Sequence, residues 1–204
     1  KINASLTDWM QMTYTTRFSR TDFQTPTIMS SGTDEFYFNA CRYWPTIPTT
    51  DPNGHYVPES YIERLENGGI YRTQSDVLSQ QLALRITPLE GWVINAELNY
   101  RINNDNNHNE NITTYGYNAD NVPFVDYYSN SWVQEYNYKS NYFNPNIFTE
   151  YSFSLKEDHN FKVMAGFQSE WLRDRSITAN QYGINAGLPT LNTTSSNPKV
   201  SGGY

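Results

Sequence analysis

The stretch WVINAELNYRI, residues 92–102, decides the fold class. Its even-numbered positions are apolar or aromatic, whereas its odd-numbered positions from Asn95 onward are polar or charged. Successive side chains of a β-strand point to opposite faces, so this order produces one apolar face and one polar face. A helix would scatter Glu97 and Arg101 among the apolar side chains. The stretch is therefore predicted to be a β-strand.

The same alternation recurs on both sides of this stretch and predicts three antiparallel hairpins. Six strands are expected at approximately residues 1–6, 9–23, 73–87, 92–102, 136–155 and 160–173. The turns within the hairpins are short, whereas long loops are expected at approximately residues 24–72, 103–135 and 174–204. Outer-membrane β-barrels have short periplasmic turns and long extracellular loops, which matches this asymmetry. A soluble sandwich usually has loops of similar length at both ends.

Four local features refine this outline. Residues 156–159, KEDH, are predicted to form the turn of the third hairpin. The asparagine-rich run at residues 103–111 is expected to be a solvated loop tip. Pro145 cannot donate a ladder hydrogen bond, so it is expected near a strand end or at a bulge. Residues 51–54, DPNG, are predicted to form a turn, because Pro presets φ and Asn-Gly accepts positive φ.

The composition suits strands that meet lipid on one face and water on the other. Aromatic residues make up 16% of the chain and charged residues only 17%, while the mean hydropathy is -0.72. The net charge of -7 argues against non-specific nucleic-acid binding, which needs a basic surface. Cys41 is the single cysteine, so the chain can form neither an intrachain disulfide nor a cysteine-based zinc site. The chain contains no run of 18 apolar residues, so no transmembrane helix is predicted. Strands of a membrane barrel need only about 9–11 residues.

The spacing of the aromatic residues gives an independent measure of the thickness of the apolar band. Trp92 and Tyr100 share a face and lie roughly 21 Å apart along the membrane normal, at ~3.4 Å per residue and a tilt near 40°. Phe161 and Trp171 give roughly 26 Å by the same arithmetic. Both values match an apolar band of about 25 Å between aromatic girdles. Six strands with an open edge would leave unpaired backbone groups in lipid, so the chain is expected to be an arc of a larger barrel.

Several short stretches resemble one family of transporters. They are YWPTIP (43–48), DPNGHY (51–56), TPLEGW (87–92), HNF (159–161) and AGFQSE (165–170). In their order and spacing, over nearly the whole chain, these stretches resemble SusC/RagA-type TonB-dependent transporters.

The resemblance implies a barrel of 22 strands in the outer membrane of a Gram-negative bacterium, closed by an N-terminal plug. It also implies a SusD-like surface lipoprotein as a lid, and import of oligosaccharides or peptides driven by the inner-membrane TonB complex. The plug, the TonB box and the closing strand are not found in this sequence. The fold class expected is thus all-β, an antiparallel transmembrane β-barrel segment of about six strands.

Two groups of residues are candidates for substrate contact. The first group lies on the polar parity of the strands and would face the lumen: Asn95, Glu97, Asn99, Arg101, Gln168 and Glu170. These side chains could instead merely solvate the interior or hydrogen-bond to a plug and to neighbouring strands. The second group consists of loop aromatics that could stack on sugar rings or anchor a lid protein: Tyr43, Trp44, Tyr56, Tyr115, Tyr117 and Trp132. Such residues also commonly pack a long loop against itself.

Catalysis and cofactors are not expected. The three histidines are scattered, with neither HExxH spacing nor a GxSxG motif, and no pair of carboxylates is set apart by spacing. Asp51 and Asn53 lack the remainder of a calcium-loop pattern, so no metal site is predicted. The alternative to a transporter segment is a soluble carbohydrate-binding β-sandwich that uses surface aromatics.

Overall fold

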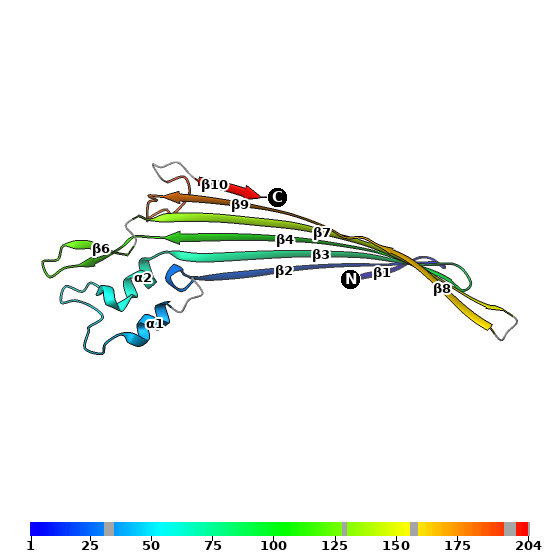
Figure 1. Cartoon of the computed structure of the whole chain (residues 1–204), viewed down its shortest axis with the longest axis horizontal. Coiled ribbons are helices and arrows are strands. Elements are labelled where there is room, and N and C mark those ends of the chain that lie inside the picture. The colour runs from blue at the N-terminus through cyan, green and yellow to red at the C-terminus, as the bar shows by residue number, and fades with distance from the viewer. Residues whose placement is uncertain (31–34, 128–129, 156–158, 194–198, 204) are drawn as a thin grey trace.

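A computed structural model describes residues 1–30, 35–127, 130–155, 159–193 and 199–203. Long strands run between an end with short turns and an end with helices and loops (Figure 1). The elements, in chain order, are β1 (Ile2–Thr7), β2 (Met10–Pro26), η1 (Thr27–Met29), α1 (Glu35–Arg42), η2 (Pro58–Ser60), α2 (Ile62–Asn67), β3 (Ile70–Leu89), β4 (Trp92–Asn111), β5 (Thr114–Tyr117), β6 (Pro123–Tyr127), β7 (Trp132–Leu155), β8 (His159–Gln168), β9 (Trp171–Tyr182) and β10 (Lys199–Gly203). Within the described ranges, no helix has the length and apolarity that crossing a membrane requires.

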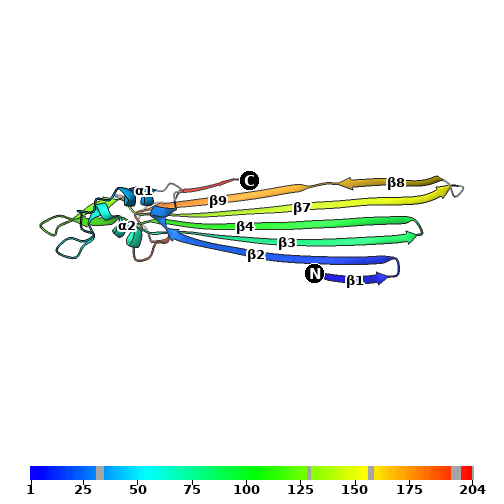
Figure 2. The same ribbon diagram turned by 90° about the horizontal axis from the view of Figure 1, so that it is seen from below.

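The strands form one antiparallel sheet in the order β1-β2-β3-β4-β7-β9-β10, and β8 also pairs with β7 (Figure 2). β8 and β9 lie along the same side of β7 in one continuous register, since Asn146 pairs with Gln168 and Phe143 pairs with Trp171. They therefore act as one strand that is interrupted at residues 169–170. A separate hairpin, β5–β6, lies at the loop end.

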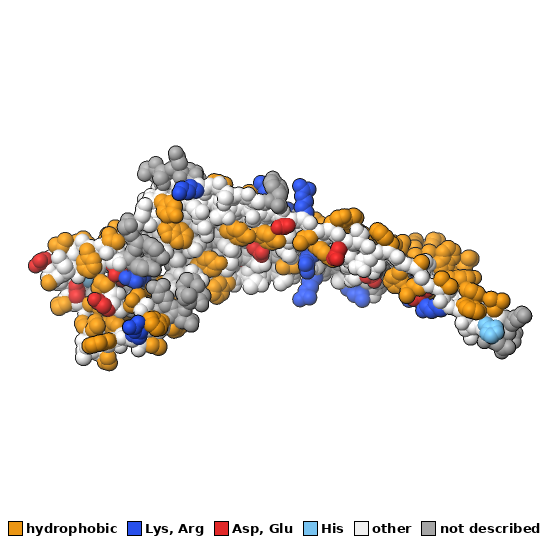
Figure 3. All heavy atoms as spheres, viewed as in Figure 1, with side chains coloured by type: hydrophobic (Ala, Val, Ile, Leu, Met, Phe, Trp, Pro, Cys, Tyr) orange, Lys and Arg blue, Asp and Glu red, His pale blue; other side chains and the backbone are white. Residues whose placement is uncertain are grey.

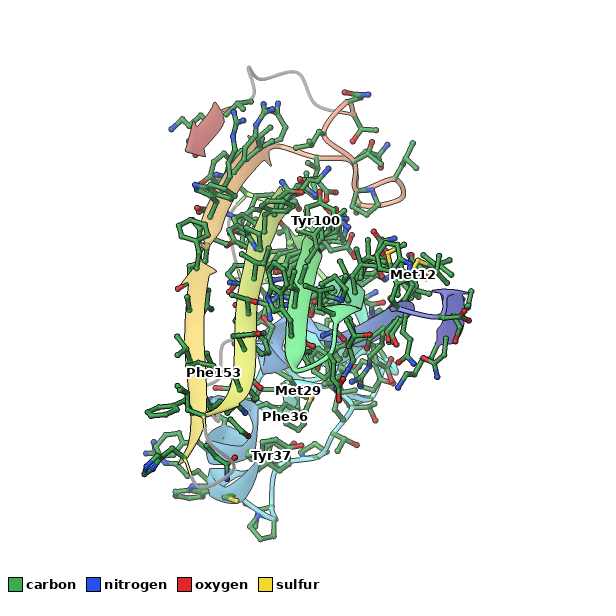
Figure 4. All side chains as sticks on the ribbon, turned by 90° about the vertical axis from the view of Figure 1, so that its right-hand side faces the viewer. Met12, Met29, Phe36, Tyr37, Tyr100 and Phe153 are labelled. Atoms are coloured by element: carbon green, nitrogen blue, oxygen red, sulfur yellow. The ribbon has the colours of Figure 1, made fainter. Side chains whose placement is uncertain are left out.

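The register places the alternating residues as the sequence predicts. Leu98 pairs with Leu82, and Leu82 pairs with Tyr14, so residues of one parity form continuous rows across the strands. We call one side of the sheet the apolar face; it carries the even-numbered residues of β2, β3 and β4 and the odd-numbered residues of β7, β8 and β9. The opposite side is the polar face. Tyr100, Met12 and Phe153 mark three strands of the apolar face in the view along the sheet (Figure 4).

Charge is fully segregated between the two faces over the half of the sheet that lies toward the short turns. Residues 10–18, 78–86, 92–102, 143–155 and 161–171 contain no charged side chain on the apolar face. Every charged residue in these segments lies on the polar face: Arg17, Arg85, Glu97, Arg101, Glu150, Lys162 and Glu170.

The main sheet is a single layer. The apolar face is open, with Phe18 60% exposed and Phe167 65% exposed. Hydrophobic side chains gather around β8 and the turn end of the molecule (Figure 3). Val133 and Ile184 are the buried hydrophobic residues found in the described part of the chain. A β-sandwich needs two sheets that bury their apolar faces against each other, so the alternative of a soluble sandwich is wrong for the described residues.

The strands extend further than the alternation indicates. Residues 103–111, expected to be a loop tip, continue β4 and pair with both β3 and β7. Their backbone groups find ladder partners on both sides, which outweighs the low strand propensity of asparagine. The expected loop 24–72 contains η1, α1, η2 and α2, and the expected loop 103–135 contains β5 and β6. In the expected loop 174–204, β9 continues to Tyr182 and β10 adds a further strand.

Pro145 lies inside β7 rather than near its end, which corrects the sequence expectation. The backbone N–H of Ser169 donates to the Pro145 carbonyl at 3.1 Å, but Pro145 has no N–H to return. The side-chain amide of Asn144 donates instead to the Ser169 carbonyl at 2.9 Å. The proline is thus accommodated where β8 gives way to β9. Of the predicted turn at residues 156–159, residues 156–158 lie outside the described residues, and His159 already begins β8, where it pairs with Leu155.

The loop end is held together by contacts between distant segments. Arg64 of α2 forms a bidentate ion pair with Asp126 of β6, at 2.8 and 2.9 Å, and both side chains are largely buried. His55 stacks on Tyr117 of β5, with ring centroids 3.7 Å apart. The predicted DPNG turn is present, because the Asp51 carboxylate accepts hydrogen bonds from the backbone N–H groups of residues 53 and 55.

Candidate functional site

The polar face carries a continuous array of amide and charged side chains at the junction of β4, β7 and β8. In one row Glu97 pairs with Asn146, which pairs with Gln168. In the next row Asn99 pairs with Asn144, and beyond it Arg101 pairs with Tyr142. The structure therefore places the six lumen candidates of the sequence on one face, in adjacent rows: Asn95, Glu97, Asn99, Arg101, Gln168 and Glu170.

Tyr142 connects the charged members of this array. Its hydroxyl donates to a Glu170 carboxylate oxygen at 2.7 Å, and the Arg101 guanidinium lies over its ring at 5.4 Å from the centroid. Arg101 and Glu170 are thus linked through one side chain although they lie on different strands. Tyr142 is not among the candidate residues predicted from the sequence. Its position on the polar parity of β7, opposite Arg101, requires the strand register to be known.

A depression of about 350 Å³ opens beside Tyr142 on the polar face. Arg17, Ser79 and Arg101 lie side by side in one row along its floor, because Ser79 pairs with both arginines. Gln81 and Asn99 form the next row. Guanidinium and carboxamide groups offer several hydrogen-bond donors and acceptors, and guanidinium binds carboxylates in a bidentate manner. The depression can therefore receive a polar ligand that has carbonyl, carboxylate or hydroxyl groups.

Further along the polar face the charges compensate each other. Lys162 of β8 forms an ion pair with Glu150 of β7 at 2.7 Å. These two side chains are partly exposed, so the pair contributes little to stability. Its position shows that charged groups continue along this face toward the turn end.

Most of the loop aromatics serve local packing. The Tyr43 hydroxyl donates to the Pro48 carbonyl at 2.8 Å, and Tyr117 stacks on His55. The Tyr56 hydroxyl donates to Glu66 at 3.4 Å, and that carboxylate raises the pKa of Tyr56 above its usual value. These residues lie at the loop end, and within the described ranges none of these contacts joins them to the polar array on the sheet.

Three further loop aromatics differ in exposure. Trp44 is 71% exposed and Tyr115 is also exposed. Trp132 begins β7 opposite Asn111 and is only partly exposed. Trp44 and Tyr115 are therefore the loop candidates with the most ring surface left for a partner or ligand.

No group of three or more His, Cys, Asp or Glu residues within the described ranges lies close enough to hold a metal ion. Cys41 is an exposed free thiol. The chemistry offered by the site is hydrogen bonding and charge, and its residues lie on a sheet face rather than in a deep cleft.

Comparison with known proteins relates this arrangement to solved transporters. No family model and no curated protein matches the chain. The RagAB peptide importer in its closed-closed state matches with a TM-score of 0.68 at 17% identity, and in its open-open state with 0.68 at 14% identity. A further structure of the RagAB peptide transporter matches with 0.65 at 16% identity. Each match covers 98% of this chain and 23% of the other chain.

The present chain thus spans about a quarter of the length of the RagAB chains that it matches. The matching region is antiparallel β-structure, and its neighbours are transporter structures. This chain has the fold of one segment of a RagAB peptide importer chain, the type of protein that its sequence motifs resemble.

Proposed function

We propose that this chain forms part of the wall of a SusC-type transporter that imports peptides across a bacterial outer membrane. In this proposal the apolar face meets lipid, the polar face lines the import path, and the loop end faces the cell exterior. A SusD-like lipoprotein covers the loop end, and the TonB complex drives import through other parts of the protein.

The observation that carries the proposal is the segregation of charge. A charged side chain on the lipid face of a barrel costs about 2–4 kcal/mol at the bilayer midplane for Arg or Lys. The apolar face carries no charge over the segments that would span the bilayer, while the same segments carry Arg, Lys and Glu on the polar face. A water-exposed sheet has no such constraint on one face.

The girdle residues support the same placement. Trp92 pairs with Tyr151 near the turn end, and Tyr100 pairs with Phe143 eight residues further along β4. Phe143 stacks on Trp171, with centroids 5.3 Å apart. Aromatic rows at two levels on the lipid face are typical of outer-membrane barrels.

The polar array favours a peptide over a sugar as substrate. Sugars in protein sites commonly stack on exposed aromatic rings, but the ring of Tyr142 is covered by Arg101. The remaining groups of the depression include Arg17, Gln81 and Asn99, which match peptide carbonyls, N–H groups and carboxylates. The RagAB structures that share the fold are those of a peptide importer.

Spin labels on adjacent residues test this arrangement. In a Cys41→Ser background, Leu98→Cys would place a label on the apolar face and Asn99→Cys would place one on the polar face. In lipid vesicles we expect the first label to relax preferentially with oxygen and the second with a water-soluble nickel complex. Equal accessibility of both labels to nickel would refute the proposal.

Uptake measurements test the substrate. Cells that depend on this transporter should accumulate a labelled peptide but not a labelled oligosaccharide of similar size. Arg101→Gln should reduce peptide uptake several-fold without changing the amount of protein in the membrane. Asn160→Gln, on the polar face near the turn end, serves as the control.

A further inference from the structure

A cluster of cations lies on the apolar face directly beyond its last aromatic row. Phe143 pairs with Trp171, and the next residues on this face are Asn141 and Arg173, which pair with each other. One step further, Lys139 pairs with Arg175. The face therefore changes within two rows from stacked rings to three positive charges.

Two positively charged side chains, Lys139 and Arg175, lie directly opposite each other in the sheet. Directly opposed side chains lie with their Cβ atoms about 4.5–5.5 Å apart, and like charges at such positions are destabilising. Neither Lys139 nor Arg173 forms an ion pair or a side-chain hydrogen bond with another described residue.

The nearest acidic group in the same row is already engaged. Asp76 lies two strands from Lys139, because Asp76 pairs with Asn104 and Asn104 pairs with Lys139. Both oxygens of Asp76 accept hydrogen bonds from Arg20, at 2.6 and 2.7 Å. The same level of the sheet thus carries a compensated pair on β2–β3, whereas Lys139 on β7 forms no ion pair with a described residue.

A depression accompanies this cluster. It has a volume of about 360 Å³ and is lined by Lys139, Asn141, Arg173 and Arg175, together with Asn137, Asp174 and Ile177. Asp174 has the opposite parity to Arg173 and Arg175, so it belongs to the polar face. The stacked pair Phe143–Trp171, whose rings are nearly parallel at 19°, lies one row from Asn141 and Arg173 on the same face. Polar donors and cations therefore lie beside an aromatic row on the same face of the sheet.

We propose that this cluster binds the anionic phosphate headgroup of a membrane lipid whose acyl chains lie against Phe143 and Trp171. The inference rests on the proposed placement of the apolar face in a bilayer. Guanidinium groups bind phosphate oxygens in a bidentate manner, and ammonium adds a point charge. A lipid fits better than free phosphate, because the cations stand at the border of the apolar band, where headgroups are held at high local concentration.

Brominated lipids can test the proposal through Trp171. The complete transporter is reconstituted with lipids that carry bromine on their acyl chains, and fluorescence quenching is compared between phosphatidic acid and phosphatidylcholine. The signal of Trp171 is obtained as the difference from Trp171→Phe, which keeps an aromatic ring in the stack. We expect phosphatidic acid to be preferred over phosphatidylcholine by on the order of a hundredfold, since three basic residues near a membrane surface contribute about 1 kcal/mol each and a factor of ten corresponds to about 1.4 kcal/mol.

Charge-matched variants distinguish lipid binding by this cluster from attraction of lipid by the overall positive charge of the surface. Lys139→Gln combined with Arg173→Gln should abolish the preference. Arg20→Gln combined with Arg72→Gln removes the same charge from the same face on β2–β3 and should leave most of the preference intact. Quenching by phosphatidylcholine in each variant verifies that Trp171 still meets lipid.

The possible outcomes separate this inference from the proposed function. If Trp171 is quenched equally by both lipids, or if the Lys139/Arg173 variant keeps the preference, the lipid site is refuted while the membrane placement stands. If inorganic phosphate at millimolar concentration removes the preference, the cluster is a site for free phosphate rather than for lipid. If neither lipid quenches Trp171, the membrane placement itself fails.

Discussion

Replacing Asn144 should reveal how the sheet tolerates a proline in the middle of a long strand. Asn144 is 8% exposed, and its amide supplies to the Ser169 carbonyl the hydrogen bond that Pro145 cannot give. Asn144→Ala leaves that carbonyl without its partner, which costs about 1–3 kcal/mol for a buried group. In a Pro145→Ala background the new backbone N–H can donate to Ser169, so the same replacement should cost well under about 1 kcal/mol.

The difference between the two costs is the quantity to measure. A double-mutant cycle on the complete barrel in lipid vesicles, with each free energy of unfolding measured by urea titration, should give a coupling energy of about 1–2 kcal/mol. The cycle cancels the packing that is lost with the proline ring. Asn146→Ala is the control, because Asn146 flanks Pro145 on the same face and forms no side-chain hydrogen bond among the described residues. Additive effects of Asn144→Ala and Pro145→Ala would refute the compensation.

Three further measurements probe the sheet and the loop end. Ala96→Arg, at mid-height of the apolar face, should lower the free energy of unfolding in vesicles by about 2–4 kcal/mol, whereas Glu97→Arg should cost far less; equal costs would contradict the assignment of faces. Burial lowers the pKa of His108, but hydrogen bonds to its two carboxylate partners outweigh burial and raise it above 6.5. Its stabilisation should therefore be complete below pH 6.5 and lost as pH rises through the raised pKa, so His108→Gln should cost more stability at acidic than at alkaline pH. Arg64→Ala leaves the buried Asp126 unpaired, should weaken the loop end by about 3–5 kcal/mol, and should speed hydrogen exchange in β5 and β6.

The alternation of residues was sufficient to predict the main strands and their two faces. Trp92 to Ile102 carries a strict two-residue period, and a period of two has a direct geometric meaning in a strand. The asparagine-rich continuation of β4 has no such period, because asparagine occupies both faces there. Its strand conformation depends on the neighbouring strands, which local sequence does not show.

The candidate site was predictable in part. Asn95, Glu97, Asn99 and Arg101 share a parity, so a common face follows from the sequence of one strand. Their association with Tyr142 depends on the register between β4 and β7, and a shift of one residue would reverse the faces. Helices α1 and α2 were missed because each is short, with eight and six residues.

The ion pair between Arg64 and Asp126 has a consequence for recognition at the loop end. These residues are 62 positions apart, yet they fasten helix α2 to the β5–β6 hairpin. A partner that contacts an isolated flexible loop loses affinity to the entropy of ordering it. Here much of that ordering is complete before any partner binds. A partner can therefore bind two segments from distant parts of the chain as a single preorganised surface.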